Sequence, residues 1–484
     1  MVYDELLKLH PAPVWRYFSE ILSVPRPSKR EEKIIRHLKA FGAEHNLETL
    51  VDDLGNVVIR KPATKGMEGK PTVILQSHID MVCEKNSDVE HDFDKDPIVP
   101  RIEKGWVMAT GTTLGADDGI GMAVQLAVLA ADDIPHGPVE CLFTVDEETG
   151  LTGAFGLKSD MLQGRILLNL DSEDEGEIFI GCAGGIDTVA EFDLETEEVP
   201  PGHVPFRITV RGLTGGHSGD DIHKGRGNAV KILNRILWHG ATLFGMRLAH
   251  LDAGNLRNAI AREGEAVVVI PEENVADARK WFPDFAADLV AETHITEPDL
   301  KIRIEPHSLP VTVLSKGLQH RLLNALYACP HGVMEWSREI PDFVETSTNL
   351  ASVKVEPQYI MVTTSQRSSV ESARDDVKSM VAAVFALSGA RYTHSGGYPG
   401  WTPNPQSGVL KVAREVYTSL YQSDPKVLAI HAGLECGVIG EKYPGMDMIS
   451  FGPTIRGAHS PDERLEIASV DRFWRLLTGI LGSV

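Results

Sequence analysis

The sequence lacks long apolar runs, and basic residues are few relative to acidic ones. No stretch of the 484 residues approaches the roughly 20 uncharged apolar residues of a membrane-spanning helix. The N-terminal segment has Asp4, Glu5 and Lys8 where a signal peptide needs an unbroken apolar run, so we expect a cytoplasmic protein. With 47 basic and 69 acidic residues, the formal net charge is −22. Nucleic acids and anionic membranes are therefore not expected as partners, because their phosphates would be repelled.

Cysteine is also scarce. The five cysteines, which have no CxxC spacing, are Cys83, Cys141, Cys182, Cys329 and Cys436. An odd, scattered set of this kind is typical of reduced thiols in a cytosolic protein. Hydrophobic residues make up 42% of the chain, enough for a sizeable core, and the length favours two domains.

Strand and helix patterns alternate at both ends of the chain, which predicts an α/β fold with a mostly parallel central sheet. Short apolar runs at 73–77, 139–145 and 166–170 are typical of strands buried on both faces. A β-hairpin is expected over 47–62, turning at 53–56. Further strands are expected at 426–431 and 447–452. Helices are expected at 14–22, 29–45, 119–132, 407–422, 434–443 and 471–481.

The middle third of the chain has a different pattern. Strands of an antiparallel sheet are expected at 206–213 and 265–273, with helices at 228–240 and 274–292. The segment 256–280 is weakly echoed by 348–384, so the inserted domain is either one unit or two related halves. We therefore predict a first domain of residues 1–186 and 397–484, interrupted by an α+β domain over 187–396.

Metal-capable side chains follow five separate stretches, most of them apolar runs. They are His78 and Asp80 after PTVILQS, Asp117 and Asp118 after GTTLGA, Glu147 and Glu148 after VECLFTV, Asp171 after ILLNL, and His459 after MDMISFGPTIRGA. In an open parallel sheet, functional groups gather beyond the carboxyl ends of the strands. Two imidazoles and several carboxylates at that edge are what a pair of divalent metals with one bridging carboxylate needs.

The spacing of these residues suggests individual roles. His78 is expected to bind metal while Asp80 accepts its other ring N–H, and Asp117 is placed to bridge two ions. Of the adjacent Glu147 and Glu148, one can ligate while the other acts as general base.

Each role has a simpler alternative. His78 could be a hydrogen-bonded loop histidine and His459 a turn histidine. Asp171 could be a solvated acid, and Asp117–Asp118 could cap the following helix. The joint pattern outweighs these alternatives, because five such coincidences are hard to produce by chance.

The motifs SHIDMVCEK, GTTLGADDGIGMA, DEETGLTGA, LNLDSE, GGHSG and GAHSPDE occur in this order. In this, the chain resembles the M20 family of dinuclear zinc peptidases over essentially its whole length, and LGADDGIGMA resembles its dipeptidase and tripeptidase branches. The resemblance implies a catalytic domain with an inserted lid, two Zn²⁺ ions for which Co²⁺ or Mn²⁺ can substitute, and a cis peptide at Asp117–Asp118.

The resemblance also implies a role for each residue. Asp117 bridges both ions; His78 and Asp171 complete one site, and Glu148 and His459 the other. Asp80 lies behind His78 and Glu147 is the general base. In the lid, His217 stabilises the oxyanion, Asn258 lies near the substrate and Arg367 holds its carboxylate. The alternative for His217 is a glycine-rich turn, and the alternative for Asn258 and Arg367 is a surface or strand-edge position.

For Glu435, which follows a strand, we expect either a contact with the substrate's α-amino group or a solvated acid at a helix start.

The implied reaction is hydrolysis of short peptides, Xaa-His dipeptides such as carnosine above all, with broad tolerance. A tripeptidase or N-acyl amino acid amidohydrolase of the same architecture is the alternative. A catalytically silent relative would be expected to lack its general base, and Glu147 is present. The resemblance implies a homodimer, although a duplicated lid could imitate a partner within one chain.

Overall fold

The computed structural model describes residues 3–484, and the chain forms two compact units. The first unit contains the residues up to Gly181 together with Trp401–Ala429 and Leu434–Val484; the second contains Cys182–Gly400 and Ile430–Gly433. The two long boundaries lie within six residues of 187 and 396. The short return of 430–433 to the second unit has no counterpart in the sequence analysis.

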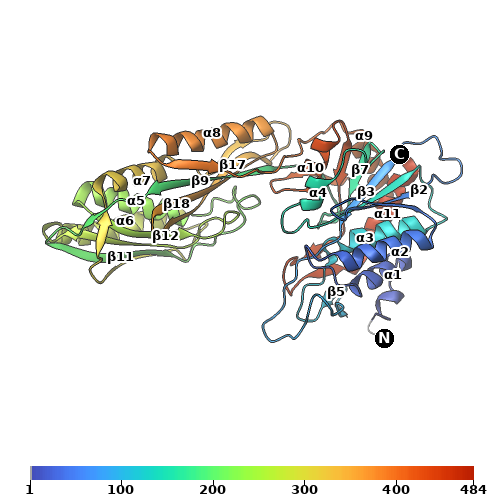
Figure 1. The fold of residues 1–484 in the computed structure, drawn as a ribbon, viewed down its shortest axis with the longest axis horizontal. Helices are drawn as coiled ribbons and strands as arrows, with labels where there is room; N and C mark the ends of the chain where they lie inside the picture. The colour runs from blue at the N-terminus through green and yellow to red at the C-terminus, as the bar shows by residue number, and fades with distance from the viewer. Residues whose placement is uncertain (1–2) are drawn as a thin grey trace. The chain divides into compact units, whose positions relative to one another are not determined.

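The first unit is built on an eight-stranded sheet (Figure 1). In spatial order its strands are β1 (Glu48–Val51), β2 (Val57–Lys61), β6 (Val139–Thr144), β3 (Val73–His78), β7 (Ile166–Asn169), β21 (Asp447–Ser450), β8 (Glu177–Cys182) and β20 (Lys426–Ile430). The central strands β6, β3, β7 and β21 are parallel, β1 and β2 pair antiparallel with their neighbours, and β8 pairs antiparallel with β21. The predicted parallel centre and the predicted hairpin β1–β2 are both confirmed.

Burial explains the composition of the central strands. Every residue of β3 and β6 is buried, as is expected for parallel strands covered on both faces. Continuous apolar runs are therefore a reliable signal for these two strands.

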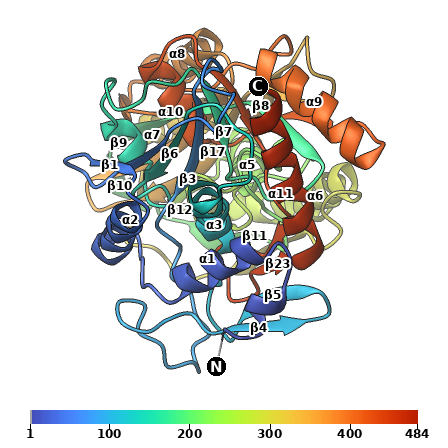
Figure 2. The same cartoon turned by 90° about the vertical axis from the view of Figure 1, so that its right-hand side faces the viewer.

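Helices surround this sheet. They are α1 (Ala12–Leu22), α2 (Glu32–Glu44), α3 (Ala116–Ala130), α4 (Thr152–Gly156), α9 (Gly408–Tyr421), α10 (Glu435–Lys442) and α11 (Ile467–Ser483), with a 3-10 turn at Leu6–Lys8. Helix α3 packs on β3 and α1 packs on α3, whereas α9 contacts both β21 and α11. Figure 2 shows α9 and α11 side by side. A small sheet of β4 (Pro100–Glu103), β5 (Trp106–Ala109), β22 (Ile455–Arg456) and β23 (Arg464–Glu466) completes the unit.

The second unit contains a nine-stranded sheet and four helices, which lie in the region where an α+β domain was expected except for the first residues of β9. Its elements are β9 (Gly184–Asp193), β10 (Thr196–Glu198), β11 (His203–Arg211), α5 (Ala229–Phe244), β12 (Arg247–Gly254), β13 (Gly264–Pro271), α6 (Glu272–Thr293), β14 (Lys301–Pro306), β15 (Thr312–Leu314), α7 (Lys316–Ala328), β16 (Gly332–Trp336), β17 (Val344–Val355), β18 (Tyr359–Ser368), α8 (Glu371–Leu387) and β19 (Arg391–His394). Its core is formed by apolar side chains of this unit alone.

The second unit consists of two halves with the same order of elements. The inner half runs β11-α5-β12-β13-α6-β14, and the outer half runs β9-α7-β17-β18-α8-β19. In the inner half β11 lies between β13 and β14, and in the outer half β9 lies between β18 and β19 in the same way. The strands β12 and β17 pair antiparallel and join the two halves. The pair β10–β15 flanks the inner half where it is inserted into the outer one. Duplication of one βαββαβ motif would produce this arrangement.

Two general features accompany the fold. Within residues 3–484, no helix combines the length and the apolar character needed to cross a membrane. None of the five cysteines, all of which lie within the described residues, forms a disulfide, and four of them are buried.

Candidate metal centre

The predicted metal ligands of the first unit converge at the carboxyl ends of its parallel strands. His78 ends β3, the glutamate pair follows β6, Asp171 follows β7, and the segment with His459 follows β21. Asp117 is contributed by the first turn of α3. Because loops that follow parallel strands meet at one edge of the sheet, these residues come together although they are far apart in the chain.

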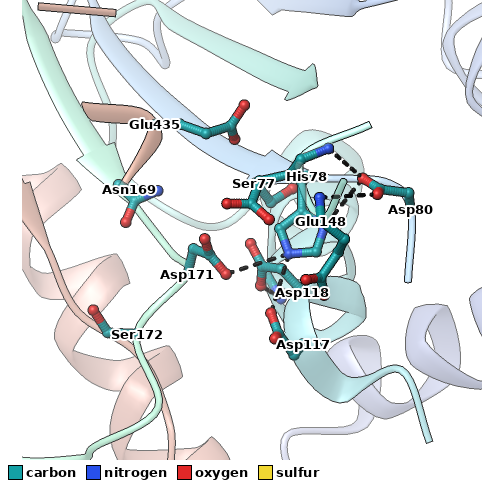
Figure 3. Close-up of polar contacts among 12 residues, drawn as sticks. Ser77, His78, Asp80, Asp117, Asp118, Glu148, Asn169, Asp171, Ser172 and Glu435 are labelled. Carbon is teal, nitrogen blue, oxygen red and sulfur yellow. Dashed lines mark hydrogen bonds and ion pairs between the residues drawn. The ribbon is translucent and has the colours of Figure 1, made fainter. Parts of the chain in front are cut away.

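Asp117 lies between the two histidines. Its Oδ1 is 3.0 Å from His78 Nε2 and its Oδ2 is 3.1 Å from His459 Nε2. Each imidazole also has a second carboxylate: Asp171 Oδ1 is 3.4 Å from His78 Nε2, and Glu148 Oε2 is 3.1 Å from His459 Nε2. Figure 3 shows Asp117 and Asp171 directed toward His78. The geometry is that of two ligand groups sharing one bridging carboxylate.

The donor atoms suit divalent metal ions. In each group the potential ligand atoms lie within 4.8 Å of one another. Glu148 Oε1 is buried and has no hydrogen-bond partner among residues 3–484, so the protein itself leaves an acceptor free there. Imidazole nitrogen and carboxylate oxygen are ligands that zinc, cobalt and manganese accept, and zinc sites of one or two histidines with carboxylates have this composition.

Asp80 supports the centre from behind. Its Oδ1 is 3.4 Å from His78 Nδ1, as predicted for the acid that orients this imidazole. The same carboxylate accepts the backbone N–H groups of Glu147 (3.0 Å) and Glu148 (3.2 Å) and the hydroxyl of Ser28 (2.7 Å). Although burial raises it, these hydrogen bonds and the charge of His78 lower the pKa of Asp80 to about 2. Asp80 therefore stays ionised, and it fixes the position of the His78 imidazole and of the backbone at Glu147 and Glu148.

The glutamate pair divides into two roles. Glu148 contacts His459, whereas Glu147 has a carboxylate oxygen within 4.8 Å of ligand atoms of both His78 and Glu148. Burial, followed by the charges of Asp171, Glu435 and Glu148, raises the pKa of Glu147 well above its usual value despite the opposing charge of His78. A carboxylate of this kind accepts a proton more readily than a solvated one.

The histidines are strongly basic in the absence of a cation. Hydrogen bonds with Asp117 and Glu148 raise the pKa of His459 to about 11. Burial lowers the pKa of His78, but the charge of Asp171 and hydrogen bonds with neighbouring carboxylates raise it well above its usual value. In both cases neighbouring carboxylates favour the protonated imidazole.

Two of the simpler alternatives can be assessed. Asp171 is 10% exposed, so the solvated-acid alternative is wrong. Helix capping applies to Asp118, whose Oδ1 accepts the N–H of Gly121 at 3.0 Å, while Asp117 faces the histidines. The peptide between Asp117 and Asp118 is cis, as the family resemblance implied.

Glu435 is fully buried at the start of α10, so the solvated-acid alternative is wrong for this residue too. Its Oε2 accepts hydrogen bonds from Gln76 Nε2 (2.5 Å) and Thr144 Oγ1 (2.7 Å), and its Oε1 has no partner among the described residues. Burial raises the pKa of Glu435 to about 7. Figure 3 shows it on the same side of His78 as Asn169.

The three candidate residues of the second unit lie on loops and a strand of that unit. His217 Nδ1 faces the backbone N–H groups of Gly219 (3.3 Å) and Asp220 (3.2 Å), and it lies 3.4 Å from the carboxylate Oδ2 of Asp220. The loop with Asn258 runs beside it, since the carbonyl of Asn258 accepts the N–H of Ser218 at 2.8 Å.

Arg367, on β18, is nearly buried in the second unit. It donates from Nη1 to Tyr398 Oη at 2.7 Å, while its Nε has no partner within residues 3–484. Burial raises the pKa of Asp220, but a hydrogen bond with His217 and the charges of His217 and Arg367 lower it below its usual value. His217 and Arg367 are thus within electrostatic reach of the same carboxylate.

Three residues that support the centre were missed by the sequence analysis: Ser28, Arg26 and Glu463. Ser28 binds Asp80, Arg26 donates to backbone carbonyls beside Asp80, and Glu463 accepts backbone N–H groups beside Asp117. Glu463 lies in the motif GAHSPDE, four residues past His459, and this proximity was the available signal. Arg26 and Ser28 precede the predicted helix and have no ligand nearby in the sequence.

Comparison with known proteins agrees with this geometry. Residues 74–482 match the family model described as peptidase family M20/M25/M40. The chain is 43% identical over 481 residues to the cytosol non-specific dipeptidase of Escherichia coli, covering 99% of both chains. It is 46% identical to the aminoacylhistidine dipeptidase of Vibrio alginolyticus, whose crystal structure it matches with a TM-score of 0.93 over 99% of this chain and 98% of that one. An aminopeptidase PepT structure from Bacillus cereus shares the fold at 16% identity and a TM-score of 0.57, over 98% of this chain and 99% of that one. The chain belongs to peptidase family M20/M25/M40.

Proposed function

We propose that this protein is a dipeptidase that uses two zinc ions bridged by Asp117. The observation that supports this most directly is that the two oxygens of Asp117 face different imidazoles, each of which has a second carboxylate of its own. His78 and Asp171 would hold one ion, and Glu148 and His459 the other. The printed names of the relatives in E. coli and V. alginolyticus support a dipeptide substrate, and the cytosolic location in the former name supports a cytoplasmic protein.

Divalent ions bound there would supply Lewis acidity, which lowers the pKa of water and polarises the substrate carbonyl. Glu147 accepts the proton of the attacking water and then donates it to the leaving amine. Asp80 fixes the position of Glu147 through the backbone hydrogen bond described above. The reaction therefore needs the buried carboxylate of Glu147 in its ionised form at the start of each cycle.

For the second unit we propose substrate contacts. Arg367 has an unpaired Nε–H and a delocalised charge, which suit the terminal carboxylate of a peptide. The Nε2–H of His217 suits the developing oxyanion. We assign Asn258 to the same group on the family resemblance, because its side chain has no such distinguishing contact. In this proposal the buried Glu435 stabilises the edge of the sheet. Contact with the substrate's α-amino group is the alternative role.

The substrate class is tested by measuring hydrolysis of β-Ala-His, Gly-Gly-Gly and N-acetyl-methionine by the purified protein. We expect zinc-dependent cleavage of the dipeptide, loss of cleavage after chelation, and recovery when zinc is returned. Cleavage of β-Ala-Ala serves as the control for a histidine preference. Preferential cleavage of the tripeptide or the N-acyl amino acid would contradict the dipeptidase proposal and favour the corresponding alternative.

A further inference from the structure

The carboxylate of Glu463 accepts four consecutive backbone N–H groups in the loop that leads into α3. Its Oε2 accepts from Leu114 (2.7 Å) and Gly115 (2.9 Å), and its Oε1 accepts from Ala116 (2.7 Å) and Asp117 (3.3 Å). Glu463 is 2% exposed, so water does not compete for these donors. A helix start leaves such N–H groups without intrahelical partners, and a carboxylate there also meets the positive end of the helix dipole.

The backbone at the start of α3 does not have the ordinary helical conformation. Asp117 has φ −81° and ψ 111°, and Asp118 has φ −106° and ψ 40°, both outside the helical region. Gly115 has φ +69°, and a Cβ there would lie 2.6 Å from Arg26 Nη2. The backbone around Asp117 therefore depends on groups outside the helix for its position.

Arg26 holds the same loop from another side. Its buried guanidinium donates from Nη2 to the carbonyl of Gly115 and from Nη1 to the carbonyls of Ile79 (3.1 Å) and Asp80 (2.5 Å). Gly115 is thus bound at its N–H by Glu463 and at its carbonyl by Arg26. Through Arg26 the loop is joined to the segment that begins with His78.

We propose that Glu463 is a positioning residue for the metal centre, which fixes the bridging carboxylate of Asp117 relative to His459. Glu463 lies four residues beyond His459 and binds the N–H of Asp117, so it links two segments that supply ligands to the same ion. The inference rests on the proposed function, because it assumes that Asp117 bridges two metal ions. Residues that orient metal ligands typically contribute about 10- to 100-fold to metal affinity.

The test compares Glu463→Gln with Glu140→Gln. Glutamine keeps the shape of Glu463 but turns one acceptor oxygen into an NH₂ group that faces N–H donors. Glu140 is a matched control: it is also 2% exposed and accepts the backbone N–H groups of Gln163 (2.8 Å) and Gly164 (2.9 Å). Zinc affinity is measured by competition with a chelating dye, and the zinc-induced rise in melting temperature is measured in parallel.

We expect Glu463→Gln to lose about 10- to 100-fold in zinc affinity and to show a smaller zinc-induced rise in melting temperature. Glu140→Gln should melt at a lower temperature while it keeps wild-type zinc affinity. Wild-type affinity in Glu463→Gln, or equal losses in the two variants, would overturn the inference. If Glu463→Gln does not fold, Glu463→Asp is measured against the same control; it retains the charge on a shorter side chain, and wild-type zinc affinity in it would overturn the inference. Failure of the wild-type protein to bind zinc would instead overturn the proposed function.

Discussion

At the scale of single residues, the centre combines two histidines with a surplus of carboxylates. Without a cation this surplus makes the two histidines basic. Hydrogen bonds with Asp117 and Glu148 raise the pKa of His459, and the charge of Asp171 and hydrogen bonds with neighbouring carboxylates raise that of His78. A metal ligand must be the neutral imidazole, so a metal ion has to displace these protons. Metal binding and pH are therefore coupled in this protein.

We predict that zinc binding at pH 7 releases roughly two protons from the imidazoles. Proton release can be measured by titration calorimetry in buffers of different ionisation enthalpy. His459→Asn should release about one proton fewer, because the remaining imidazole still exchanges its proton for metal. Zinc affinity should fall as the pH is lowered. Binding that is independent of the buffer and of pH would contradict this prediction.

The raised pKa of His459 also makes the stability of the metal-free protein depend on pH. The pKa of His459 is about 11 in the folded state, against about 6.5 for an unperturbed histidine. The ion pairs of His459 therefore stabilise the metal-free fold fully below about pH 6.5, and this contribution is lost as the pH rises through the folded-state pKa.

Sequence reasoning succeeded best for residues with unusual chemistry. His78, Asp117, Glu148, Asp171 and His459 were recognisable because each follows a strand or precedes a helix, and the structure brings all of them together. Glu463, Arg26 and Ser28 were not recognised, because their roles consist of hydrogen bonds to backbone groups or to Asp80, which no local pattern reveals. For the same reason the buried hydrogen bonds of Glu435 with Gln76 and Thr144 were not predicted.

At the scale of elements, buried polar side chains link the strands that lead to the centre. Gln76 on β3 donates to Glu435 and accepts from Asn169 Nδ2 on β7 (2.6 Å), and Asn169 in turn accepts from Ser450 on β21. All four of these residues are fully buried. The sequence analysis treated these strands as continuous apolar runs, and it had no means of pairing polar residues that are distant in the chain.

We predict that Gln76→Leu lowers the free energy of unfolding of the first unit by about 2–5 kcal/mol, because it leaves the Asn169 amide without its partner and removes one of the two hydrogen bonds of Glu435 Oε2 in the buried sheet. Urea denaturation followed by fluorescence provides the measurement. Gln422→Leu, at the partly exposed C-terminal end of α9, is the control and should change the unfolding free energy by less than about 0.5 kcal/mol. An equally small effect of Gln76→Leu would show that the polar chain does not stabilise the strands.

At the scale of the whole molecule, the division into an α/β unit and an inserted α+β unit could be predicted because the two patterns have different periodicities. The boundaries were less accurate, since β9 continues almost directly from β8, with one residue between them, and leaves no linker to recognise. The weak echo in the sequence corresponds to β13 and α6 of the inner half and to β17, β18 and α8 of the outer half. Equivalent topology survives where sequence similarity is nearly lost, because a fold tolerates many substitutions that preserve its pattern of burial.

The two halves also bear on oligomeric state. The antiparallel pairing of β12 with β17 joins within one chain two sheets that have the same strand order. Such a pairing could equally join two chains, so a duplicated lid provides internally what a dimer would provide between subunits. The homodimer implied by the family resemblance stays a prediction.

The central claim is that Asp117 bridges two catalytic zinc ions and Glu147 is the general base. It is tested most directly by counting bound zinc and measuring β-Ala-His turnover in the wild-type protein and in Glu147→Gln. We expect two zinc ions per chain in both proteins, and a fall in kcat of about 10²- to 10⁴-fold in the variant alone. A single ion per chain in the active wild-type protein, or a Glu147→Gln variant that retains its turnover, would contradict the account.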